Sequence, residues 1–137
     1  MAKDIIHDAV KNALIKDGWQ ITHDPFRMEY EEIEVFADLA AERSPIVAEK
    51  EGRKMVVEIK TFAGRSFIRQ LQQALGQYSL YLDIIELNKL DYELYLAISH
   101  STYYDFFLRK GTREIIERRQ LKVLVVDVVR EEIIQWF

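Results

Sequence analysis

The sequence predicts an α/β fold, in which a mixed β-sheet is flanked by an N-terminal helix and by one long helix. Apolar residues recur with helical spacing at 2–17 and again at 67–85. Short apolar runs rich in β-branched residues, typical of strands, lie between and after these stretches. The predicted order is a helix, three or four strands, the long helix, a strand, short helices and further strands. Strands that alternate with helices in this way pack as a sheet covered by helices.

The composition limits the class of protein. The chain has 137 residues, of which 49% are hydrophobic, so we expect one globular domain over residues 1–137 with a sizeable core. It contains no cysteine, which excludes disulfides and thiolate metal sites. Its first residues lack the shape of a signal peptide, and no apolar stretch reaches membrane-spanning length. We therefore expect a cytoplasmic protein without membrane contact.

The net charge limits how the chain can bind nucleic acid. A formal net charge of −4 argues against a protein that coats nucleic acid without sequence preference. The segment 105–122 differs, because it has six basic residues and three acidic ones. It is either a local basic surface or a solvated helix face, and the solvated face is favoured.

The N-terminal helix is expected over residues 2–17 and ends at Gly18, a natural C-terminal stop. Its apolar stripe consists of Ile6, Val10, Ala13 and Leu14. His7 leans toward this stripe. A histidine in such a place is more often a hydrogen-bonded core residue than a catalytic one, so a structural role is favoured for His7.

The strands that follow are read from alternation and turn signals. We expect a short strand at 19–22, an extended segment at 26–30, a strand at 33–41 and another at 46–49. The turn residues at 23–25, the break at 43–45 and the flexible Gly52 separate them.

Residues 54–62 form the centre of the predicted sheet. Side chains alternate across a strand, so Glu58 and Lys60 point to one face and Ile59 to the other. A carboxylate and an ammonium in an apolar strand are costly to bury without partners. Either this face is open to water, or the pair takes part in chemistry.

A second acid, Asp38, closes an apolar run and is separated from Glu58 by nineteen residues. This spacing allows a turn and a returning strand, which can bring Asp38, Glu58 and Lys60 together. Two carboxylates suit Mg²⁺, which binds them with water and substrate phosphate. Lys60 then orients the water or stabilises the developing negative charge. Glu42 and Glu49 are nearby carboxylates that could replace Asp38 or assist it, but we prefer Asp38 because it directly follows an apolar run.

The long helix begins after Ser66, its expected N-cap. Its core stripe consists of Phe67, Leu71, Ala74, Leu75, Tyr78, Tyr81, Leu82 and Ile85. Beside the stripe run Gln70, Gln73 and Gln77, whose amides either bind a backbone, a phosphate or a metal-bound water, or lie against the rim of the sheet. Gly76 costs a helix about 1 kcal/mol relative to alanine, so its presence indicates close packing.

The C-terminal third is expected to complete the sheet. We predict strands at 94–98, 121–129 and 133–137, the first two of them buried on both faces. Short helices are expected after His100 and after Gly111, the second capped by Thr112. Aromatic residues 103, 106 and 107 are expected in the core or on a partner surface, rather than as a platform for bases.

The order of these features resembles the PD-(D/E)xK nuclease superfamily: an acid, a spacer of about twenty residues, Glu-x-Lys and a glutamine-bearing helix. The resemblance implies a restriction-endonuclease-like fold in which Asp38 and Glu58 bind Mg²⁺, Lys60 assists the attacking water, and Gln73 or Gln77 supports the site. Ala37 stands where that superfamily often has proline, a departure that it tolerates.

A narrower resemblance covers almost the whole chain. The motifs HDAVKNAL (7–14), KDGW (16–19), THDP (22–25), DLAAER (38–43), AEK (48–50), VEIK (57–60), QALGQY (73–78) and LYLA (94–97) together resemble the XisH family. That family is named for control of the excision of the cyanobacterial fdxN element during heterocyst development. The resemblance implies a role beside a site-specific recombinase and the companion protein XisI.

Two functions follow as hypotheses. The first is a Mg²⁺-dependent DNA endonuclease, with Mn²⁺ as an alternative cation, in which Asp38, Glu58 and the Ile59 carbonyl hold the metal. The second is a non-catalytic accessory protein that keeps the nuclease fold and binds DNA weakly or only its protein partners. A homodimer is compatible with both. A small-molecule enzyme has no support, because the chain lacks a glycine-rich phosphate loop, an activated serine and cysteine.

Overall fold

The computed structural model describes residues 2–43 and 52–137. The strand predicted at 46–49 and the candidate ligand Glu49 lie outside these residues. Within them the elements are α1 (Ala2–Lys16), β1 (Gln20–His23), β2 (Phe26–Tyr30), β3 (Ile33–Ala37), β4 (Leu39–Arg43), β5 (Arg53–Ile59), α2 (Phe67–Leu87), β6 (Glu93–Ser99), α3 (His100–Thr102), the π-helical turn η1 (Tyr103–Phe107), α4 (Lys110–Arg118), β7 (Val123–Asp127) and β8 (Glu132–Trp136).

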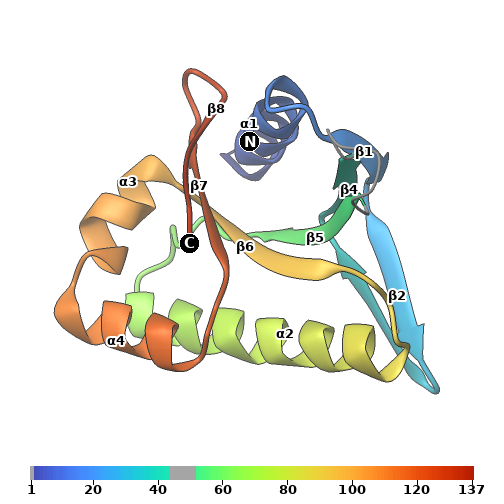
Figure 1. Ribbon diagram of the computed structural model, residues 1–137. Helices are drawn as coiled ribbons and strands as arrows, with labels where there is room; N and C mark the ends of the chain where they lie inside the picture. Colours follow the sequence, from blue (N-terminus) through green and yellow to red (C-terminus); the bar gives the residue numbers. More distant parts are fainter. Residues whose placement is uncertain (1, 44–51) are drawn as a thin grey trace.

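Six strands form one mixed sheet in the order β1-β4-β5-β6-β7-β8. The pairs β5·β6 and β6·β7 are parallel, and the other three pairs are antiparallel. β2 and β3 form a separate antiparallel hairpin that projects from one side of the molecule (Figure 1). The predicted mixed α/β class is therefore confirmed.

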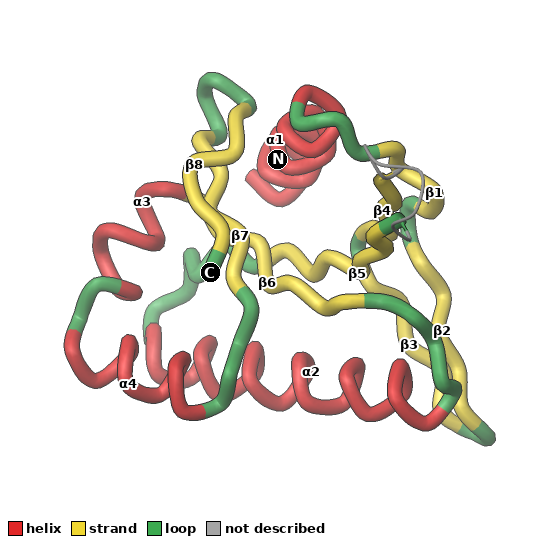
Figure 2. Tube along the Cα trace, viewed as in Figure 1, coloured by secondary structure: helices red, strands yellow, loops and turns green. Residues whose placement is uncertain are grey.

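Helices cover both faces of the sheet. α2 runs along one face with α4 beside it, and α1 lies on the other face (Figures 1 and 2). Successive residues of β5 enter different cores, since Val56 packs in the cluster under α2 whereas Met55 and Val57 pack in the cluster under α1. The central strand is thus buried on both sides, which agrees with its run of apolar residues.

The helix α2 has the predicted cap and most of the predicted stripe, although Phe67, Leu75 and Leu82 are only half-buried and Ile84, which was not predicted, is buried. The backbone N–H of Arg69 donates to Ser66 Oγ at 3.2 Å. The buried residues of the helix are Leu71, Ala74, Tyr78, Tyr81, Ile84 and Ile85. Gly76 is exposed, and a Cβ atom built there would have no neighbour within 4 Å. The expectation of close packing at Gly76 is therefore wrong.

The strand predicted over 33–41 is two strands that belong to different sheets. β3 pairs with β2 in the hairpin, whereas β4 pairs with β1 and β5 in the main sheet. The chain changes sheets at Asp38. Alternation of apolar residues continues through this junction, so the sequence pattern gives no sign of the change of partner.

The C-terminal third follows the prediction with shifted boundaries. α4 begins at Lys110, so Thr112 lies inside the helix and does not cap it. The basic residues of segment 105–122 are all exposed, as expected of a solvated face. In the described parts of the chain, no helix combines the length and the hydrophobicity needed to cross a membrane.

Candidate active site

The junction between β3 and β4 places Asp38 beside the end of the central strand. β4 and β5 are antiparallel with Leu39 opposite Val57, so Asp38 falls opposite Glu58. The side chain of Glu58 lies on the same face of β5 as that of Val56, which is the face that α2 covers. Two carboxylates from neighbouring strands therefore meet at the same end of the sheet.

Hydrogen bonds to the backbone fix both carboxylates. The N–H of Asp38 donates to Glu58 Oε1 at 3.3 Å, and the N–H of Ile59 donates to Asp38 Oδ2 at 2.7 Å. Lys60 Nζ lies 3.7 Å from Glu58 Oε2. The structure thus brings together Asp38, Glu58 and Lys60, the three charged residues that were expected to meet.

A notch of about 530 Å³ opens at this point. It is lined by Phe36, Asp38, Glu58, Ile59, Lys60, Thr61, Gln77 and Tyr81. Several charged and polar groups converge on this notch, and such groups fix the orientation of a bound ligand.

The environment of Glu58 disfavours its ionised form. Only 8% of Glu58 is exposed, and burial together with the negative charge of Asp38 raises the pKa of Glu58 to about 8, against a smaller opposing effect of Lys60. Two carboxyls that share a site cannot both ionise easily. A bound cation reverses this balance, because it stabilises both negative charges.

The three glutamines of α2 lie in different environments. Gln77 lines the notch, and its Nε2 donates to the Tyr81 hydroxyl at 3.4 Å. The Oε1 atom of Gln77 is buried without a hydrogen-bond partner among the described residues. Gln73 is exposed and does not line the notch, and Gln70 lies further toward the N-terminus of the helix. Of the two candidates, only Gln77 is beside the carboxylates.

Tyr81 belongs to the notch as well as to the core stripe. Its hydroxyl donates to the carbonyl of Phe36 at 3.1 Å, two residues before Asp38. Burial, and then the charge of Glu58, raise the pKa of Tyr81 to about 12, so this hydroxyl stays a donor. The helical spacing of Tyr81 indicates only burial, and nothing in the sequence signals this contact.

The structure places His7 beside Asp38 but Glu42 away from it. His7 Nδ1 lies 4.0 Å from Asp38 Oδ1. Glu42 pairs in register with Lys54, four residues before Glu58 along β5. That is about 13 Å along a strand, so Glu42 is not part of the notch.

The donor set suits a hard cation. Asp38 and Glu58 offer carboxylate oxygens, and the carbonyl of Ile59 points to the same side of β5 as its N–H, which contacts Asp38. Among residues 2–43 and 52–137, no three histidine or acidic side chains are gathered as a ready-made metal site. Mg²⁺ commonly takes one or two carboxylates and completes its shell with water and phosphate, so the residues fit it.

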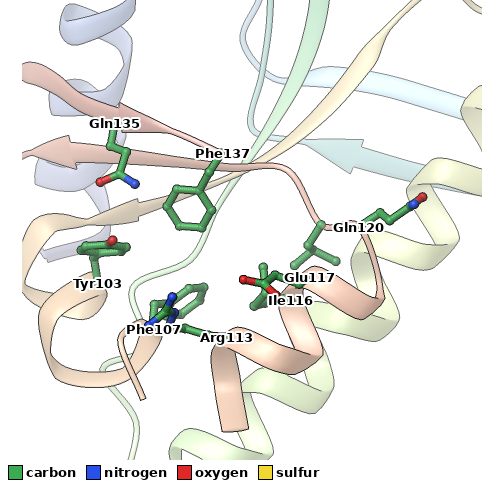
Figure 3. Close-up of a pocket in the computed structure, with 9 residues that line it drawn as sticks. Tyr103, Phe107, Arg113, Ile116, Glu117, Gln120, Gln135 and Phe137 are labelled. Atoms are coloured by element: carbon green, nitrogen blue, oxygen red, sulfur yellow. The ribbon is translucent and has the colours of Figure 1, made fainter. Parts of the chain in front are cut away.

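A second pocket, of about 310 Å³, lies between η1, α4 and β8. Tyr103, Phe107 and Phe137 surround it, with Arg113 and Glu117 beside them (Figure 3). It shares no residue with the notch and has no pair of neighbouring carboxylates among its lining residues. The pair of neighbouring carboxylates therefore belongs to the notch and not to this pocket.

Comparison with known proteins gives a consistent result. The family model described as XisH protein matches residues 1–134. A crystal structure of an XisH family protein from Nostoc punctiforme PCC 73102 is similar, with 39% identity, a TM-score of 0.86 and coverage of 97% of this chain and 98% of that chain. A crystal structure of an fdxN element excision controlling factor protein from Anabaena variabilis has 40% identity, a TM-score of 0.85 and the same coverage. No curated protein matches the chain.

Proposed function

The chain belongs to the XisH family, and from this premise we propose that it controls the excision of a DNA element and acts as a Mg²⁺-dependent DNA endonuclease. The similar protein of Anabaena variabilis is described as an fdxN element excision controlling factor, which supports the first part. One observation supports the second part, the endonuclease activity. Asp38 and Glu58, from neighbouring strands, meet with Lys60 in a single polar notch.

We propose further that the fold is restriction-endonuclease-like. The sheet is mixed, helices cover both of its faces, and the acidic pair lies at the end of its central strands. In this arrangement the sheet fixes the acids, while Phe36 of the hairpin and Gln77 and Tyr81 of α2 complete the lining of the notch.

The residues of the notch would divide the reaction among them. Asp38, Glu58 and the Ile59 carbonyl would hold Mg²⁺, and Glu58 would lose its proton when the cation binds. When bound, Mg²⁺ supplies Lewis-acid chemistry, which polarises a phosphoryl oxygen and lowers the pKa of water.

Lys60 and Gln77 would act on the water and the phosphate. The Lys60 ammonium stabilises the negative charge that develops on the phosphoryl oxygens, and the Gln77 amide, which lines the notch, orients the attacking water. The water oxygen bonds to phosphorus as the bond to the leaving sugar oxygen breaks. The attacking water releases one proton to solvent, and the leaving sugar oxygen takes one proton from solvent. Positioning and charge stabilisation are sufficient for this chemistry.

A non-catalytic accessory role is the second candidate, and a specific observation favours it. Both carboxylates already accept backbone N–H groups, and a protonated Glu58 needs no cation for its stability. The net charge of −4 also disfavours broad DNA binding. In this role the protein would contact DNA weakly or act only through protein partners.

The partners proposed for both roles are DNA, an XisI-like protein and a site-specific recombinase. Light scattering of the chain alone and mixed with an XisI-like protein tests the protein partner and homodimer formation together. A mass equal to the sum of the two chains supports the complex. Unchanged separate masses at high concentration contradict it.

Nicking of supercoiled plasmid in Mg²⁺ or Mn²⁺ tests the endonuclease. We expect activity from the wild type and none from Asp38→Ala or Lys60→Ala. Asp83→Ala is the matched control, since Asp83 is an exposed acid of α2 outside the notch. No nicking at high protein concentration, with no heat of cation binding in calorimetry, would leave only the accessory role.

A further inference from the structure

We propose that His7 is a further residue of this site, where it accepts a hydrogen bond from a water molecule beside Asp38 and so strengthens the binding of a divalent cation. The inference rests on the proposed function, because it concerns the same cation. It adds a group from α1, on the face of the sheet opposite α2 (Figure 1).

Asp24 and Lys11 hold the His7 ring in place. Asp24 Oδ1 lies 2.8 Å from His7 Nε2, and Lys11 Nζ donates to Asp24 Oδ2 at 2.9 Å. His7 and Lys11 are four residues apart on α1 and therefore share a face of the helix. The turn before β2 supplies Asp24, so two separate segments fix the orientation of one imidazole.

This contact determines the tautomer of His7. Burial would raise the pKa of Asp24, but hydrogen bonds from Lys11 and His7 outweigh it and hold that pKa below its ordinary value. An ionised carboxylate only accepts hydrogen bonds, so His7 Nε2 must carry the hydrogen. In the neutral ring, Nδ1 then keeps its lone pair. Histidines that act at metal sites are typically oriented by a carboxylate on their other nitrogen.

The lone pair of His7 Nδ1 faces the oxygen of Asp38 that accepts no backbone N–H. Asp38 Oδ2 accepts from the backbone of Ile59, whereas Oδ1 faces His7 Nδ1 at 4.0 Å. That distance is too long for a direct hydrogen bond. Two acceptors at this separation can both receive hydrogen bonds of about 2.8 Å from one water molecule.

Hydrated Mg²⁺ keeps several waters, and each needs acceptors for its hydrogens. His7 Nδ1 supplies one beside Asp38 Oδ1, without being a ligand itself. This agrees with the lack of a three-residue cluster of potential ligands among the described residues. Loss of such an outer partner typically weakens metal binding about 10- to 100-fold.

Two isosteric variants separate this role from a structural one. His7→Asn keeps an acceptor at the place of Nδ1 but loses the contact with Asp24. His7→Gln keeps a donor toward Asp24 but has no acceptor at the place of Nδ1. His23→Gln is the matched control, since His23 is exposed and does not line the notch, with its ring beside Phe26 and its Nδ1 beside the Thr22 hydroxyl.

Calorimetry with MnCl₂ is the first measurement, with thermal unfolding to verify folding. We expect His7→Gln to weaken Mn²⁺ binding about tenfold, and His7→Asn and His23→Gln to bind nearly as the wild type does. The inference is overturned if His7→Gln binds normally while His7→Asn does not, or if both variants bind normally.

Nitrogen NMR of the imidazole rings at pH 8, without metal, is the second measurement. We expect His7 to carry its hydrogen on Nε2, and a hydrogen on Nδ1 would overturn the inference. Wild-type protein that binds Mn²⁺ but cleaves no DNA would contradict the endonuclease alone. Wild-type protein that binds no Mn²⁺ would contradict both proposals.

Discussion

Asp38 and Glu58 are linked through the backbone as well as through charge, because the N–H of Asp38 donates to Glu58 Oε1 at 3.3 Å. The next residue of β5 completes the arrangement, since the Ile59 N–H donates to Asp38 Oδ2 at 2.7 Å. The register of β4 on β5 therefore sets the distance between the two carboxyls before any ligand binds. This preorganisation keeps two acids together in a buried place, which has a measurable effect on stability.

The pH dependence of stability should reveal Glu58. Its pKa rises from 4.5 to about 8 in the folded protein, because burial and Asp38 disfavour the ionised form. Between these values the folded chain keeps the proton that the unfolded chain loses. The free energy of unfolding should therefore fall as the pH rises, by at most about 1.4 kcal/mol per pH unit. Urea denaturation from pH 5 to 9 in EDTA measures this slope.

Glu58→Gln is the control for this measurement, since an amide does not titrate. We expect a flatter profile over the same range and no less stability at pH 8. Adding Mn²⁺ to the wild type at pH 8 should restore stability, because the cation favours the ionised carboxyl. An equal slope in both proteins would contradict the role given to Glu58.

Tyr81→Phe should destabilise the junction between β3 and β4, which carries Asp38. The hydroxyl donates to the Phe36 carbonyl at 3.1 Å, and its loss leaves that carbonyl without this donor. We expect a loss of about 1–2 kcal/mol in the free energy of unfolding, measured by urea denaturation, together with weaker Mn²⁺ binding. Tyr104→Phe removes an exposed hydroxyl and should change neither. Equal effects of the two variants would contradict the positioning role.

Much of the fold was predictable because local patterns determine it. The spacing of apolar residues located α1 and α2, and the apolar content of 94–98 indicated a strand buried on both faces. The carboxylate pair was also predictable, since an acid at the end of one strand and Glu-x-Lys on its neighbour come together by strand pairing.

Other parts depend on contacts between distant segments. The change of sheet at Asp38 depends on which strands pair with β3 and β4, and alternation is the same on both sides of it. The contact of His7 with Asp24 needs α1 to lie beside a turn seventeen residues away. Neither relationship leaves a signal in the spacing of residue types.

Gly76 is a local position where the sequence pattern was misleading, and it offers a simple test. The residue lies inside α2, is exposed, and has open space where a Cβ would stand. Gly76→Ala should therefore raise the free energy of unfolding by about 0.5–1 kcal/mol, through higher helix propensity. Urea denaturation measures the change. A loss of stability would mean that a neighbour approaches this face after all.

Gln77 and Gln73 allow a direct test of which amide serves the site. Both lie on α2 one turn apart, but only Gln77 lines the notch, with a buried Oε1 that no described residue satisfies. If the Gln77 amide orients the attacking water, Gln77→Ala should lower the rate of plasmid nicking about tenfold, and Gln73→Ala should leave it unchanged. Gln77→Glu tests the chemistry more finely, because it keeps an acceptor while adding a negative charge that a cation can offset. If Gln73→Ala lowers the nicking rate and Gln77→Ala does not, Gln73 is the amide that serves the site. In that case DNA would have to reach α2 from its exposed side.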